Sequence, residues 1–338
     1  MSQVSASNVP ESGLSRIIGR LTQNQSITEI LKQSIGALVL PTIGLLLFLM
    51  LWAMAAPKVV TSLGQFPGPA QVWQQMEGLV TEHQESRATE VAFYERQEKR
   101  NAARVAKDPS YTPKIRAYTG KATFFDQIGT SLITVMAGFL VATAIAVPSG
   151  IVIGLSSALY TAANPLIQLF KPVSPLAWLP LVTMVVSAVY VSDDPMVSKS
   201  FLTSMITVTL CCLWPTLINT AVGVAGIPQD LKNVSHVLRL NWLTHVIKIV
   251  IPSSIPMVFT GLRLSLGIAW MVLIAAEMLA QSPGLGKFVW DEFQNGSSNS
   301  LGRIMAAVIV IGLIGFLLDR TMLMIQRKAS WDKSAVLR

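Results

Sequence analysis

The feature that most constrains this chain is a run from Gln127 to Phe170 that contains no Asp, Glu, Lys, Arg or His. Over the whole chain, 51% of the residues are hydrophobic, only 13% are charged, and the mean hydropathy is +0.53. A soluble domain carries about 25% charged residues. Here the charges are crowded into a few blocks between long apolar ones, as expected when lipid solvates some segments and water the others. The sequence therefore predicts an integral membrane protein.

The net charge of +8 raises nucleic-acid binding as an alternative. The Lys and Arg residues lie beside the apolar blocks, however, and form no patch interleaved with aromatic residues, so no nucleic-acid partner is expected. The two cysteines, Cys211 and Cys212, are adjacent within an apolar run. They are interpreted as small core residues of a helix, because a disulfide framework needs spaced cysteines in a small secreted chain.

Six membrane-spanning helices are predicted from apolar runs long enough to cross about 30 Å of hydrocarbon. The first covers residues 36–56. Ala53-Met54-Ala55 resembles a signal-peptidase site, but the leader is too long and the apolar run too extended for a cleaved signal. The second lies near residues 127–154 and is followed by a turn. The other four are predicted from Pro172 to Ser192-Asp193-Asp194, from Ser200 to Gln229, from Ile249 to Ala280, and from Ile304 past Asp319 and Arg320.

Residues 57–126 form a hydrophilic insert between the first and second spans. Few helix breakers occur between Val72 and Ala106, which favours a surface helix ending at Asp108-Pro109. The short loop between the fourth and fifth spans is basic, and so is the C-terminal tail. Because short basic loops stay in the cytoplasm, both termini (residues 1–35 and 327–338) are expected there, with the insert outside; long loops cross largely regardless of charge.

The segment from Pro228 to Trp242 is short and amphipathic. Pro228 suits the first turn of a helix, after which apolar residues recur at helical spacing on one face and basic residues on another. One interpretation is a helix that lies passively on the bilayer surface. The other is a helix that binds a partner protein, as amphipathic helices do when their apolar face enters a groove.

This segment resembles the cytoplasmic signature of binding-protein-dependent ABC permeases. The signature reads Glu-Ala-Ala, three residues, Gly, nine residues, Ile, one residue, Leu-Pro. Laid on this chain it begins at Asn233, and its last positions fall on Ile249 and Ile251-Pro252. In the first part of the signature the chain departs from it at four positions: Asn233 for Glu, Val234 and Ser235 for the two Ala, and Arg239 for Gly.

Three further stretches resemble spans of the same family. They are residues 131–150 for the second span, Ser174 to Leu181 for the third, and Phe259 to Met278 for the fifth. The resemblance covers about residues 125–330. It is greatest with the branch that imports nitrate, nitrite, cyanate or bicarbonate, and sulfonate and taurine permeases are near relatives.

The resemblance implies an all-α integral membrane fold of the type I ABC importer kind, with six spans per subunit and a long extracytoplasmic loop after the first. It implies a five-helix permease core over residues 127–326, with a coupling helix at about 228–243. The partners it implies are a second permease subunit in a homodimer, two ATPase subunits that hold ATP and Mg²⁺, and an extracytoplasmic solute-binding protein, in the bacterial inner membrane. The implied ATPase-coupling residues are Asp230, Leu231, Lys232, Asn233, Val234, Ser235, His236, Leu238 and Arg239.

Several charged or aromatic residues within the predicted spans are candidates for the transport pathway. Arg263 lies inside the fifth span, where a charge costs on the order of 2.5–3.5 kcal/mol; it either attracts an anion or makes a structural contact with a neighbouring helix. Lys171 is either an anchor at the cytoplasmic entry of the third span or a cation of the inner pathway. Glu277 suits a gate or helix packing, and Asp319 and Arg320 are interpreted as interface residues. The candidate pathway residues are Lys171, Ser174, Trp178, Arg263, Trp270 and Glu277.

The chain contains no GxxxxGK[ST] loop, so ATP hydrolysis is expected on separate subunits. His83, His236 and His245 do not have metal-ligand spacing, and no enzyme activity, cofactor or metal is expected of this chain. Two other transport functions stay open: a sulfonate or taurine importer, and a secondary transporter that needs no ATPase. The second is disfavoured because no internal repeat is visible. A scaffold without transport would leave Arg263 and the amphipathic segment unexplained.

Overall fold

The computed structural model describes residues 27–61, 64–108, 110–191, 197–297 and 299–329, and their side chains apart from those of residues 27–38 and His236. This part divides into two compact units, residues 27–71 and residues 72–329, each of which is described by itself. The predicted cytoplasmic segments 1–35 and 327–338 lie mostly outside the described residues, and Asp193 and Asp194 lie wholly outside them.

The first unit is a long apolar helix followed by a small hairpin. Helix α2 (Ile27–Ala55) starts before the predicted residue 36 and contains Pro41. The Trp52 indole nitrogen donates a hydrogen bond of 3.1 Å to the Pro67 carbonyl, which ties the chain after the hairpin to the helix. The hairpin elements are η1 (Ala56–Lys58) and the antiparallel strands β1 (Val60–Thr61) and β2 (Gly64–Gln65), with Val60 opposite Gln65.

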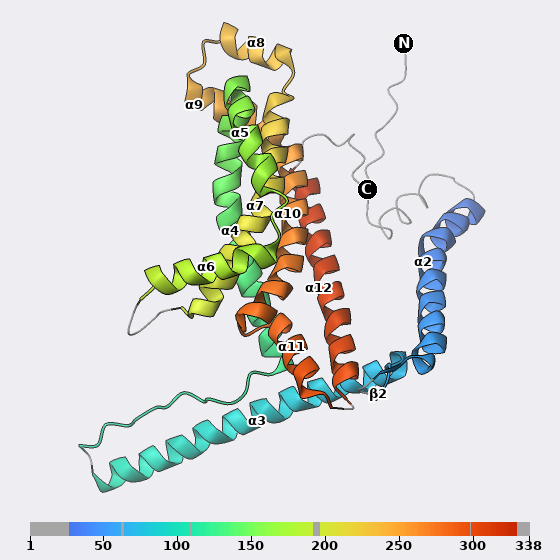
Figure 1. The fold of residues 1–338 in the computed structure, drawn as a ribbon, viewed down its shortest axis with the longest axis vertical. Coiled ribbons are helices and arrows are strands. Elements are labelled where there is room, and N and C mark those ends of the chain that lie inside the picture. The colour runs from blue at the N-terminus through green and yellow to red at the C-terminus, as the bar shows by residue number, and fades with distance from the viewer. Residues whose placement is uncertain (1–26, 62–63, 109, 192–196, 298, 330–338) are drawn as a thin grey trace. The chain divides into compact units, whose positions relative to one another are not determined.

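All the regular secondary structure in the described residues of the second unit is helical (Figure 1). Helix α3 begins at Pro69 and ends at Lys107, which confirms the helix predicted over Val72 to Ala106. Ten further elements follow in the described residues: α4 (Phe124–Leu155), α5 (Ser157–Phe170), α6 (Pro175–Val189), α7 (Lys199–Ala225), α8 (Gln229–Val237), α9 (Trp242–His245), the π-helical turn η2 (Val246–Val250), α10 (Ile251–Ala280), α11 (Leu285–Asn295) and α12 (Ser300–Ala329).

Five helical runs in the described chain are long and apolar enough to cross a membrane. The pair α5 and α6 makes a sixth span if it crosses as one bent element. The predicted all-α membrane fold is therefore confirmed. The five unbroken runs are Val39–Lys58, Phe124–Leu155, Lys199–Ala225, Trp242–Ala280 and Ser300–Ala329.

The third span differs from the straight helix that was predicted from Pro172. The chain forms α5 where a turn was expected, because Ser156 caps that helix by accepting a hydrogen bond from the Leu159 backbone N–H at 3.3 Å, and Pro165 is accommodated within it. A bend of 96° then leads into α6. With 15 residues, α6 is about 22 Å long, too short to cross alone.

The core of the second unit is α7, packed between α4 and α10. Glycines on α4 allow the close approach: a methyl group on Gly150 would lie 2.8 Å from the Leu217 carbonyl oxygen, and one on Gly154 would lie 2.6 Å from that of Ala221. Buried hydroxyls find partners between helices, as where Thr216 donates to the Ser265 hydroxyl at 2.8 Å.

Helix α3 lies across the ends of α4 and α12, at the opposite end of the unit from α8 (Figure 1). Glu82 on α3 forms an ion pair with Arg303 near the start of α12, at 2.5 Å. At the start of α4, the capping residue Thr123 bonds to His83 at 2.7 Å. The described part of the insert is thus attached to the helical core at two helix ends.

Candidate functional site

The segment predicted to contact a partner is built from two short helices. Helix α8 starts directly after Pro228 and ends at Val237, so the predicted continuous helix over 228–243 is wrong beyond Val237. The break occurs because Arg239 has a left-handed backbone, with φ 48°, and Asn241 then caps α9 by accepting from the Thr244 N–H at 2.8 Å. Arg239 occupies the Gly position of the family signature. A left-handed residue other than glycine costs about 1 kcal/mol.

Helix α8 leaves its apolar residues on the surface. Leu231 is 40% exposed, Val234 49% and Leu238 63%, although Leu238 lies just past the end of the helix. Trp242, which is 63% exposed, belongs to α9 and therefore does not continue the face of α8 as predicted. Among the polar residues predicted to contact the ATPase, Lys232 is half-buried and three are exposed: Asp230, Asn233 and Arg239.

Ser235 differs from the other predicted coupling residues, because it is buried. Its hydroxyl lies 2.8 Å from the Nδ1 atom of His245, so it joins α8 to α9 and presents little surface to a partner. The side chain of His236 lies outside the described residues.

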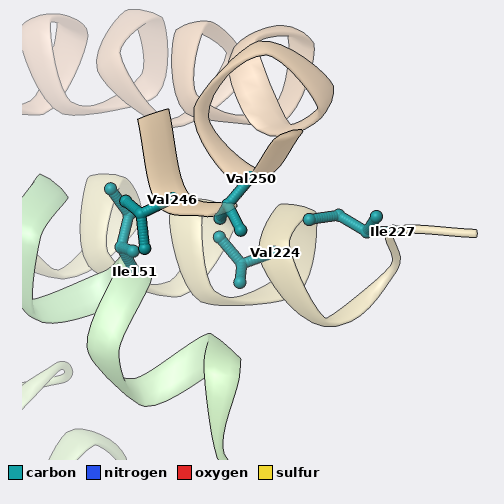
Figure 2. Close-up of a cluster of buried hydrophobic side chains, with 5 residues drawn as sticks. All are labelled: Ile151, Val224, Ile227, Val246 and Val250. Carbon is teal, nitrogen blue, oxygen red and sulfur yellow. The ribbon is translucent and has the colours of Figure 1, made fainter. Parts of the chain in front are cut away.

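The base of this segment is fixed by a buried apolar cluster (Figure 2). Val246 and Val250 of the π-helical turn pack against Ile151 of α4 and against Val224 and Ile227 at the end of α7. Val250 is fully buried, and Val224 is 1% exposed. This cluster packs the π-helical turn, which directly continues α9, against the ends of α4 and α7.

The bend between α5 and α6 brings together three of the predicted pathway residues. Lys171 caps the C-terminal end of α5 and is exposed, Ser174 caps the start of α6, and Trp178 is half-buried with its ring 6.1 Å from that of Phe170. Phe170 in turn stacks on Trp214, near the middle of α7. Lys171 therefore lies about halfway along the spans, which corrects its predicted place at the cytoplasmic entry.

Arg263 is neutralised by a neighbouring helix. Its guanidinium donates to both carboxylate oxygens of Asp319 on α12, at 2.5 and 2.8 Å. The structural interpretation of Arg263 therefore fits the geometry, and Asp319 is a helix-packing residue rather than the interface residue predicted. Such a two-pronged pair satisfies a charge in a place where water cannot.

Trp270 and Glu277 are buried within the subunit. Trp270 donates from its indole nitrogen to the Ile311 carbonyl at 3.0 Å and packs between α10 and α12. Glu277 is fully buried; the Ser131 hydroxyl lies 2.8 Å from both of its carboxyl oxygens, and the Gly286 N–H donates to one of them at 3.0 Å. Both side chains hold helices together, and neither is open to a pathway.

Sequence reasoning missed the partners of these groups. Ser131 stood out only within a family-like stretch, and it lies 146 positions from Glu277; Asp319 lies 56 positions from Arg263. A single sequence carries no signal for such distant pairs. The contact between His245 and Ser235 spans ten positions. It forms only because the chain turns between α8 and α9, and the continuous helix that was predicted would have kept the two side chains apart.

Comparison with known families identifies the larger part of the chain. Residues 142–331 match the family described as "Binding-protein-dependent transport system inner membrane component". The fold is similar to that of a chain of the MetNI methionine ABC transporter in an inward-facing conformation, with a TM-score of 0.52, 12% identity, and coverage of 61% of this chain and 96% of that chain.

Two curated proteins have higher sequence identity. The nitrate import permease protein NrtB of Leptolyngbya laminosa is 37% identical over 205 residues, which cover 60% of this chain and 68% of that protein. The bicarbonate transport system permease protein CmpB of Synechococcus elongatus is 32% identical over 298 residues, which cover 88% of this chain and 91% of that protein. The second alignment covers most of both chains.

Proposed function

Because the chain belongs to the family of inner membrane components of binding-protein-dependent transport systems, we propose that it forms the membrane pathway of an ATP-driven importer for a small inorganic anion, in the first place nitrate. The names of the two relatives given above describe them as permeases for nitrate and for bicarbonate. Both are small oxyanions, and a pathway for either needs a positive group where water is scarce.

The observation that carries the anion proposal is the position of Lys171. It lies where α5 and α6 meet at 96°, on the exposed side of the subunit. In the described part of the chain no acidic side chain forms an ion pair with it, in contrast to Arg263 with Asp319. A cation inside a membrane is costly unless it serves a pathway or a partner, and broken spans commonly line substrate sites.

Alternating access would be driven from α8. In this proposal, each of two ATPase subunits holds the exposed apolar surface of α8 on one permease subunit, and two copies of this chain enclose the pathway. The exposed side of α5 and α6 then faces the second copy, so Lys171 of each copy lines the shared path. ATP and Mg²⁺ are held by the ATPase subunits, both termini lie in the cytoplasm, and a solute-binding protein delivers the anion from outside.

Uptake by the complete transporter tests this proposal. Reconstituted in vesicles with its ATPase and binding protein, the chain is expected to import nitrate only with ATP. Lys171→Gln is expected to lower uptake about tenfold, as a loss of roughly 1.4 kcal/mol of anion stabilisation would, whereas Lys171→Arg keeps most of it. Lys199→Gln, at the exposed start of α7, is the charge-matched control.

Three results would contradict parts of this account. Uptake by the chain alone without ATP would refute the importer and favour a secondary transporter. ATP-dependent uptake of a sulfonate in place of nitrate would support the assignment as an ATP-driven importer and refute nitrate as its cargo. Unchanged nitrate uptake by Lys171→Gln would remove Lys171 from the pathway.

A further inference from the structure

The last part of α3 extends beyond the helices on which its first part rests. The contacts of α3 with the ends of the spans finish at Arg87, which forms an ion pair of 2.8 Å with Asp126 at the start of α4. Twenty more helical residues follow Arg87, and the last seventeen, from Val91 to Lys107, make about 25 Å of helix. Figure 1 shows this part of α3 beyond the other helices of its unit, accompanied by the returning chain.

We call residues 91–121 the arm. Its two halves hold one another by polar contacts: the Gln97 side chain accepts from the Arg116 N–H at 2.9 Å, and Asn101 donates to the Lys114 carbonyl at 3.1 Å. Beyond Glu90, the hydrogen bonds and ring contacts that link α3 to other described segments all go to residues 111–118. With so little apolar burial of its own, the arm needs an external surface to stay ordered.

The arm is strongly basic. It contains eight basic and three acidic residues, a net charge of +5 out of +8 for the chain. No ion pair joins these residues in the described structure, so the positive charges are available to a partner. The basic residues are Arg96, Lys99, Arg100, Arg104, Lys107, Lys114, Arg116 and Lys121, and the acidic ones are Glu95, Glu98 and Asp108.

Three of the five positive charges in the helical part of the arm lie on or beside one face of α3. The residues that pack on the ends of the spans, such as Leu79 and His83, recur every three or four positions, which keeps them on one face of the helix. The same spacing, continued along α3, reaches Arg100, Arg104 and Lys107 in its last turns. Of the acidic residues in the helical part of the arm, Glu95 lies on the opposite side of α3, and Glu98 lies at the edge across the face from Arg100 and Lys107.

We propose that the arm rests on the membrane surface and binds the headgroups of anionic phospholipids. The face of α3 that carries Arg100 and Lys107 is the face that lies on the ends of membrane-spanning helices, which is the level of the headgroups. Beyond the spans, residues 111–118 of the returning chain cover the middle of that face through Gln97, Asn101 and Arg104. The returning chain, together with the exposed Arg100 at the edge of the face, is therefore the part that meets lipid. Ile115, which is 81% exposed between Lys114 and Arg116, suits the boundary between headgroups and hydrocarbon, where apolar side chains flanked by cations are favoured.

This inference requires the family's place in the membrane but not the identity of the cargo, so it can fail without affecting the proposed function. The competing occupant is an acidic surface of the solute-binding protein. The geometry disfavours it, because a protein that approaches from the water would meet the face of α3 that carries Glu95 beside Lys99, whose charges cancel.

Hydrogen exchange in the full-length chain tests the proposal. The chain is placed in nanodiscs of phosphatidylcholine alone or with about one third phosphatidylglycerol. Backbone amides of residues 91–121 are expected to exchange at least fivefold more slowly with phosphatidylglycerol, about the factor for one cation near an anionic surface. High salt should abolish the difference, because it screens exposed charges.

Two neighbouring substitutions test whether the effect depends on which side of α3 carries the charge or only on the total positive charge of the arm. Arg100→Gln and Lys99→Gln remove the same charge from adjacent exposed positions, but only Arg100 lies on the face that continues from Leu79. Arg100→Gln is expected to lose most of the protection and Lys99→Gln to keep it. Equal exchange in both kinds of nanodisc, an equal effect of the two substitutions, or protection that appears only when the binding protein is added would each overturn the proposal.

Discussion

Replacing Glu277 by alanine is expected to destabilise the folded chain by on the order of 3–5 kcal/mol, the cost of removing one partner from a buried polar pair and leaving a cavity. The side chain is fully buried. Its loss leaves the Ser131 hydroxyl and the Gly286 N–H without their acceptor. Ser131 also accepts from the Leu285 N–H at 2.9 Å. The start of α11 therefore loses its acceptor on α10, and the Ser131 hydroxyl that holds it on α4 loses its own acceptor.

The backbone around this carboxyl group allows no substitute arrangement. A methyl group on Gly284 would collide with the carboxyl group of Glu277, and one on Gly286 with the Ile274 carbonyl. Thermal unfolding in detergent measures the effect: the midpoint temperature of unfolding is expected to fall by roughly 5–10 °C. Glu277→Gln keeps an acceptor oxygen and should cost less, and Glu98→Ala on the exposed face of α3 should cost almost nothing. A Glu277→Ala chain as stable as the original would show that the carboxyl group does not hold α11.

Replacing Val234 by aspartate is expected to separate ATP hydrolysis from transport. Val234 is 49% exposed on α8 and lies beside Leu231 on the apolar surface that we assign to the ATPase groove. A charge there must be desolvated when a groove closes around it, which costs several kcal/mol unless it is paired. The chain should still enter the membrane, while uptake per ATP hydrolysed in reconstituted vesicles falls at least about tenfold.

Asn233→Asp is the matched control for this substitution. It adds the same charge one position earlier, on an exposed side chain of the same helix that faces away from Leu231. Asn233 also stands where the family signature has an acidic residue, so coupling should be retained. If both variants kept the original ratio of uptake to hydrolysis, α8 would not be the element that the ATPase moves.

The parts of the fold that were predictable from the sequence depend on local signals. The apolar runs around α4, α7, α10 and α12 are long enough to identify these spans, and the few helix breakers after Val72 identify α3. Ser156 and Pro165 misled the prediction of a turn, because Ser caps a helix as readily as it starts a loop. The 96° bend that follows depends on how α5 and α6 pack on α7, which no local pattern encodes.

The candidate site divides in the same way. The signature-like residues from Asn233 were recognisable, and the structure adds the reason for the glycine in that signature: position 239 has a left-handed backbone, which here a bulky Arg239 adopts. The roles of Arg263 and Glu277 were not recognisable, because each depends on a partner far along the chain, Asp319 and Ser131. A charge within a span signals only that some partner exists.

The most direct test of the account is a cross-link between α8 and the ATPase. A cysteine is introduced at Val234 and another along the rim of the ATPase groove, in a chain whose Cys211 and Cys212 are replaced by serine or alanine. The account predicts a disulfide between the two subunits in inner-membrane vesicles, with a yield that changes when ATP is added. Modification of the cysteine at position 234 by an impermeant thiol reagent from the outer face, with no cross-link to the ATPase, would contradict it.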